Sequence, residues 1–187
     1  MRVRHPLRFA VPLAALMVAG CASVGPASPS APAVVAPTSP LTLSEKAFVA
    51  RAINKTLYQL EVSRLAAQRA TDARVRAYAE GMVGRQTRFT DELVRLMSAK
   101  GVPPPKGLGS DNESKLHKLA ALPPSAAFDQ GYVRVIGIED HQANISMLEQ
   151  GRRIAVDREL RAFIDRNLPI LRRELGVAQE LASSLTG

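Results

Sequence analysis

Residues 75–97 read VRAYAEGMVGRQTRFTDELVRLM and carry the clearest pattern in the chain. Apolar side chains return every three or four positions, which is the spacing of one face of an α-helix. A single polar residue, Gln86, interrupts this apolar stripe. The pattern predicts a long amphipathic helix that buries one face against other helices.

Three more amphipathic helices are expected, over residues 44–68 and 125–152 and beyond Asp157. The connection between the second and third helices is long and contains a short helix at 111–121, with Ser110 as its expected cap. Four long helices with this crossover predict an all-α, ferritin-like up-down four-helix bundle. The main alternative is a two-helix hairpin that dimerises.

Local signals indicate where these helices begin and end. Thr42 and Glu45 have the spacing of a capping box at the start of the first helix. Gly151 is expected to end the third helix. Pro169 lies inside the fourth helix and is expected to kink it, because proline cannot donate a backbone hydrogen bond.

Composition and charge exclude one class of function. Aromatic residues make up 4% of the chain, tryptophan is absent, and 25 Lys and Arg face 17 Asp and Glu for a net charge of +8. The basic residues are spread along helix faces and are not interleaved with aromatic side chains. Binding to nucleic acid is therefore not expected. Weak attraction to an anionic surface is compatible with this charge.

The first 20 residues have the layout of a lipoprotein signal peptide. Three arginines precede a short apolar run, which is about half as long as the ~20 residues that a membrane-spanning helix needs. The junction LMVAGC at 16–21 resembles a bacterial lipobox, in which the peptide is cut before the cysteine and the cysteine carries the lipid. Cys21 is the only cysteine in the chain. Ala22 follows it, and by resemblance to the sorting rules of enteric bacteria this implies the outer membrane, with the domain facing the periplasm.

Residues 21–40 are rich in proline, alanine and serine and lack an apolar face. Such a segment cannot form a core by itself, so it is interpreted as a tether. The predicted organisation is a signal peptide at 1–20, a tether at 21–40 and a four-helix domain at 41–187.

Several short pieces of sequence follow one another in a set order along the four-helix domain. They are Phe48-Val49, Leu60-Glu61, Leu65-Ala66-Ala67, Ala79, Met82-Val83, Phe128-Asp129, Tyr132, Glu139-Asp140-His141-Gln142, Leu168-Pro169 and Leu171-Arg172. In order and spacing they resemble the family called domain of unknown function 4142. This resemblance implies a ferritin-like bundle in bacterial envelope proteins that are often secreted or lipid-anchored.

The sequence departs from that family at two positions. Members often have Asp-His after the Met-Val pair, whereas this chain has Gly84-Arg85-Gln86. Members also often have a histidine shortly after Leu-Pro, where this chain has Glu174. Of the histidines that the family places in the bundle, His141 remains.

The candidate metal ligands are Glu61, His141 and Glu174, with Gln86 as a weak fourth ligand or a hydrogen-bond partner of one. Ferritin-like di-iron sites use Glu-x-x-His pairs, and no such pair occurs in this chain. The four residues are therefore either a reduced site for one transition-metal ion or a buried polar cluster without metal. A further alternative places Glu61 and Glu174 slightly off the bundle axis and in contact with solvent.

The leading hypothesis for function is a lipid-anchored envelope protein that acts as a structural or interaction module and not as an enzyme. No complete catalytic constellation and no cofactor are expected. Its partners are the membrane, through lipid on Cys21, and an envelope protein or an anionic surface. The alternative is a ferritin-like metal-binding or stress-protective protein. A sensor or chaperone is less favoured, because the bundle uses the apolar stripes and no free groove is expected.

Overall fold

The four long helices form where the sequence predicts them, and the computed structural model describes residues 40–186. The elements are α1 (Leu43–Arg69), α2 (Ala73–Ala99), α3 (Ser110–Ala120), α4 (Ala126–Tyr132), η1 (Val133–Glu139), α5 (Asp140–Ile154) and α6 (Arg158–Thr186). Between residues 40 and 186 the structure contains helices and connecting segments and no strand. The predictions for the signal peptide, the tether and Cys21 lie outside the described residues.

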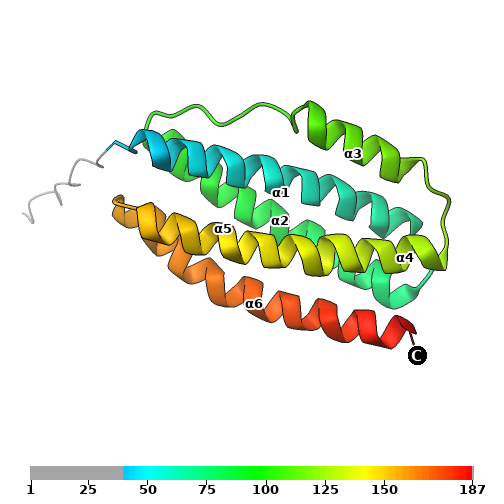
Figure 1. Ribbon diagram of the computed structural model, residues 1–187. Helices are drawn as coiled ribbons and strands as arrows, with labels where there is room; N and C mark the ends of the chain where they lie inside the picture. The colour runs from blue at the N-terminus through cyan, green and yellow to red at the C-terminus, as the bar shows by residue number, and fades with distance from the viewer. Residues whose placement is uncertain (1–39, 187) are drawn as a thin grey trace, which may run out of the picture. The chain divides into compact units, whose positions relative to one another are not determined.

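Two antiparallel helical hairpins pack into one bundle (Figure 1). The first is α1 with α2, and the second is α6 with the continuous run of α4, η1 and α5, which is the predicted third long helix. The connection after α2 travels back outside α1 and contains α3, so the third long helix runs in the same direction as α2. This crossover confirms the ferritin-like bundle. One chain supplies all four long helices, so no second hairpin is needed.

The apolar core is divided into two clusters along the bundle axis. One contains Ile53, Leu93, Leu148 and Phe163, and the other contains Val62, Met82, Tyr132 and Ile136. On α1, α2 and α5 buried polar side chains fall between the clusters; they are Thr56, Gln59, Gln86, Thr90, His141 and Asn144. The middle of the bundle is therefore a polar layer.

Two of the predicted helix starts are confirmed and one is wrong. Thr42 and Glu45 form the capping box of α1, and the Asp157 carboxylate accepts the Leu160 N–H at 2.9 Å. At α3 the N-cap is Gly109, with φ at 78°, and no side chain caps the helix. Glycine reaches this left-handed conformation without strain, which moves the cap one residue before Ser110.

The predicted end of the third helix is also wrong, because the helix continues past Gly151 to Ile154. Gly151 is buried against the Phe48 ring of α1, so its small size serves close packing of two helices. Pro169 lies inside α6 as predicted, and the helix continues through it from Arg158 to Thr186.

The Glu45 carboxylate joins the starts of α1 and α6. Its Oε1 accepts the backbone N–H groups of Val156 and Asp157, each at 2.7 Å, and its Oε2 accepts the Thr42 N–H at 2.8 Å. Burial by itself would raise the Glu45 pKa, but the hydrogen bonds from Asp157, Thr42 and Val156 together lower it below its ordinary value of 4.5. The charged carboxylate is therefore the form that stabilises the fold.

Replacing Glu45 with glutamine is expected to lower the free energy of unfolding by about 1–3 kcal/mol at pH 7, because charged acceptors form the stronger hydrogen bonds. Since the folded pKa is lowered, the carboxylate contributes fully above pH 4.5 and its contribution is lost as the pH falls through the folded pKa. The difference between wild type and variant should therefore shrink at pH 3. Urea unfolding at pH 7 and pH 3 measures it. Glu80→Gln on the exposed side of α2 is the control and should show no difference at either pH.

Candidate functional site

His141 lies two residues after the end of η1, the only segment between residues 40 and 186 that is wound as a π-helix. Its side chain is fully buried, and Nδ1 lies 3.0 Å from the carbonyl oxygen of Ile136, five residues earlier. A carbonyl oxygen can only accept, so Nδ1 carries a proton and Nε2 faces the other way. Local π-helical winding is frequent at functional sites.

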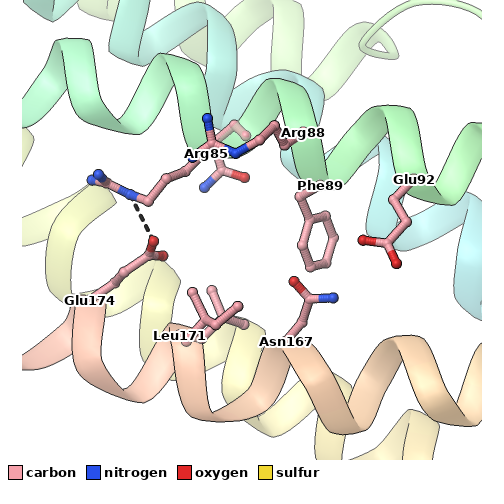
Figure 2. A pocket seen from close by; sticks show the side chains of 9 residues that line it. Arg85, Arg88, Phe89, Glu92, Asn167, Leu171 and Glu174 are labelled. Carbon is pink, nitrogen blue, oxygen red and sulfur yellow. Dashed lines mark ion pairs between the residues drawn. The ribbon is translucent and has the colours of Figure 1, made fainter. Parts of the chain in front are cut away.

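Glu174 links this histidine to Arg85, so side chains from three helices form one connected group. The Glu174 carboxylate of α6 places Oε2 3.4 Å from His141 Nε2 and Oε1 2.7 Å from Arg85 Nε of α2. Figure 2 shows Arg85 and Glu174 reaching toward one another across a cleft between α2 and α6. The cleft has a volume of about 260 Å³. The ion pair lies between this cleft and the buried histidine.

Tyr78 extends the site on the other side of Arg85. The guanidinium carbon of Arg85 lies 5.7 Å from the centre of the Tyr78 ring, which is the geometry of a cation–π contact. Burial raises the pKa of the Tyr78 hydroxyl, and Arg85 lowers it by a smaller amount. Arg85 is thus held both by a carboxylate and by an aromatic face.

The structure brings three of the four predicted site residues together. His141 and Glu174 are in contact, and Gln86 is buried and lines the same cleft as Glu174. Glu61 is elsewhere, since its carboxylate forms an ion pair with Arg64 on α1 and 36% of its side-chain surface is exposed. The expectation that Glu61 faces the interior is therefore wrong.

A buried amide pair on α1 and α5 was not predicted from the sequence. The Asn144 amide donates from Nδ2 to Gln59 Oε1 at 3.0 Å, and both side chains are buried. The signal for Gln59 was present in α1 as the heptad-like spacing of small and polar residues; these are Ala52, Thr56, Gln59, Ser63 and Ala66. The leucines of α1 instead predict a neighbouring face as the buried one.

The donor set does not fit a ferritin-type metal centre. His141 offers one ring nitrogen, and the carboxylate beside it already neutralises the permanent charge of Arg85. A cation placed there would be repelled by the guanidinium and would compete with it for Glu174. In the part of the chain that the structure describes, no three His, Cys, Asp or Glu side chains are grouped so that they could hold a metal ion.

Comparisons with known proteins agree with this architecture. The chain matches none of the curated proteins with which it was compared. A solved structure, the crystal structure of a DUF305 fragment from Deinococcus radiodurans, shares 17% sequence identity with a TM-score of 0.67. The match covers 78% of this chain and 99% of that one, and at this identity it shows the fold alone. A family profile described as domain of unknown function (DUF4142) matches residues 30–181, so the chain belongs to the DUF4142 family.

Proposed function

We propose that the protein is a lipid-anchored module of the bacterial envelope that acts by binding and not by catalysis. The observation that carries the second part is the Arg85–Glu174 ion pair over His141. In a catalytic ferritin-like centre the inward carboxylates are needed as metal ligands. Here the one carboxylate beside the histidine neutralises an arginine, so the polar layer fixes how the helices pack.

The anchor part of the proposal rests on the sequence around Cys21. The lipobox-like junction at 16–21, the unique cysteine and the Pro-rich segment after it support lipid attachment and a tethered domain. The alanine that follows the cysteine supports the outer membrane as the destination, with the domain in the periplasm. Separately, none of the helices between residues 40 and 186 is long and apolar enough to cross a membrane.

Replacing Cys21 with serine tests the anchor. We expect the full-length variant to remain unprocessed and to lose its lipid label, while the wild-type protein is cut and fractionates with the outer membrane. Globomycin, which blocks the lipoprotein signal peptidase, should make the wild type accumulate as its uncut precursor. Normal processing of the variant and an unchanged membrane fraction would refute the lipid anchor.

The metal content of the purified protein distinguishes the proposed non-catalytic module from the alternative, a ferritin-like metal-binding protein. Elemental analysis of residues 22–187 should find no stoichiometric iron, manganese, zinc or copper after exposure to each metal and desalting. Stoichiometric metal that is lost in His141→Ala and also in Glu174→Gln would overturn the proposal. Glu61→Gln is the matched control, since that carboxylate lies apart from the cleft.

A further inference from the structure

We propose that a groove beneath α3 binds a single-chain amphiphile with an anionic headgroup, of the class that includes fatty acids and lysophospholipids. The groove lies between α1, α3 and the π-helical segment η1. It is separate from the cleft beside His141, and the proposal holds whether or not Cys21 carries a lipid.

The groove has the size and lining of a site for an acyl chain. Its volume is about 520 Å³, within the range of roughly 300–1,000 Å³ that is usual for small-molecule sites. Its apolar wall comes from α3 and its end on one side and from η1 on the other; the residues are Leu119, Leu122, Val135 and Ile136. Leu122 is 47% exposed, so this end of the apolar wall is open to solvent.

The charged residues that line the groove are all basic. Lys115 and Lys118 from α3 and Arg134 from η1 line it, and no described acidic side chain does. The two lysines are exposed and form no ion pair with any residue between 40 and 186. Arg134 is paired with Glu139 on the surface, where such a pair is readily exchanged. A carboxylate or phosphate here would meet several cations at once.

α3 is attached to the bundle in the manner of a lid. It has no fully buried residue, and its apolar contacts to the core come from the half-buried Leu116 and Leu119. Its C-terminal end is held where Arg69 donates to the carbonyl of Leu122 at 3.1 Å. Its N-terminal end follows a connection with Gly101, Gly107 and Gly109 at positive φ. Such an element can lift at one end to admit a chain.

The dimensions favour a lipid over a protein helix as the occupant. A docked helix needs apolar anchors over several turns, at positions i, i+3, i+4 and i+7. The wall on this side comes from an 11-residue helix, which supplies Leu119, and from Leu122 after it. One acyl chain fits this short wall, and its acidic end then lies beside Lys115 and Lys118.

Calorimetric titration of residues 22–187 with defined amphiphiles tests the proposal. This segment contains every core residue, and its cooperative helical unfolding is checked first. Tetradecanoate is expected to bind below its critical micelle concentration. Dodecanoate, two methylenes shorter, should bind about tenfold more weakly, and dodecyltrimethylammonium, a cation, at least tenfold more weakly than dodecanoate. Comparison with a lysophosphatidylglycerol shows whether a fatty acid or a phospholipid is the better ligand.

Variants locate the site. The double change Lys115→Gln and Lys118→Gln should weaken tetradecanoate binding about tenfold. Leu122→Glu, which adds a carboxylate to an exposed wall position, should abolish it. The matched control changes Lys106 and Arg153 to glutamine, since both are exposed and the net charge falls equally. Absence of binding, equal binding of the cation, or equal weakening by the control would overturn the proposal. The proposal would also be overturned if the groove bound an amphipathic helical peptide but none of the amphiphiles.

Discussion

Replacing Lys100 with methionine is expected to lower the free energy of unfolding by about 3 kcal/mol. Lys100 caps the end of α2, and its Nζ lies 2.6 Å from Asp157 Oδ2 and 2.8 Å from Glu159 Oε2 at the start of α6. Its side chain is only 2% exposed. Methionine keeps the apolar stem but removes the charge, which leaves the covered Asp157 carboxylate without its cation. Urea unfolding measured by circular dichroism gives the loss.

Two controls distinguish this pair from an ordinary surface ion pair. Lys55→Met breaks the pair with Asp140 at 2.9 Å, where both side chains are more exposed, and should cost less than about 1 kcal/mol. Adding Asp157→Asn to Lys100→Met should recover part of the loss, because asparagine still caps α6 without an unpaired charge. A loss for Lys100→Met no larger than that for Lys55→Met would contradict this account.

Gly151→Ala is expected to destabilise the protein by about 2 kcal/mol, although alanine is the better helix former by about 1 kcal/mol. An added Cβ would lie 2.4 Å from Cε2 and Cζ of the Phe48 ring. The ring is itself buried in the first apolar cluster, so it can move away only by disturbing its neighbours. Thermal and urea unfolding should both report the loss.

The matched control is Gly176→Ala on α6, where no atom lies within 4 Å of the added Cβ. That change should stabilise the protein by about 0.5–1 kcal/mol, since only helix propensity is altered. Combining Gly151→Ala with Phe48→Leu should remove most of the clash and cost less than the sum of the single changes. Stabilisation by Gly151→Ala alone would show that the ring shifts freely.

The helices were predictable because each carries its own local signals. The capping box at Thr42 and Glu45 and the N-cap at Asp157 depend on residues within three positions of one another. The role of Gly151 in helix packing could not be predicted from local signals. It depends on Phe48, which is about a hundred residues away in the sequence, and a buried glycine looks like a helix end until its neighbour is known.

The centre of the bundle was predictable only in part, for a related reason. On α1, Leu57 and Leu65 lie one helical turn on either side of Glu61, a spacing that predicts a buried Glu61. Both leucines are only partly buried, and small and polar residues form the middle. The ion pair of Arg85 could not be predicted from the sequence, because a charged residue is normally expected at the surface. Its partner Glu174 lies on another helix, and their pairing depends on the tertiary fold.

The π-helical segment η1 has a consequence for how the chain can change in length. In a π-helix the backbone hydrogen bond joins residues i and i+5, whereas in an α-helix it joins residues i and i+4. One inserted residue can therefore be taken up as a π-helical turn without breaking the helix. Losing one residue between 133 and 139 would restore α-helical bonding and keep the two halves of the helix in phase. Phe128 and Tyr132 would then stay on the core face that they share with Ile136. The chain can therefore gain or lose one residue at this place without changing which side chains it buries.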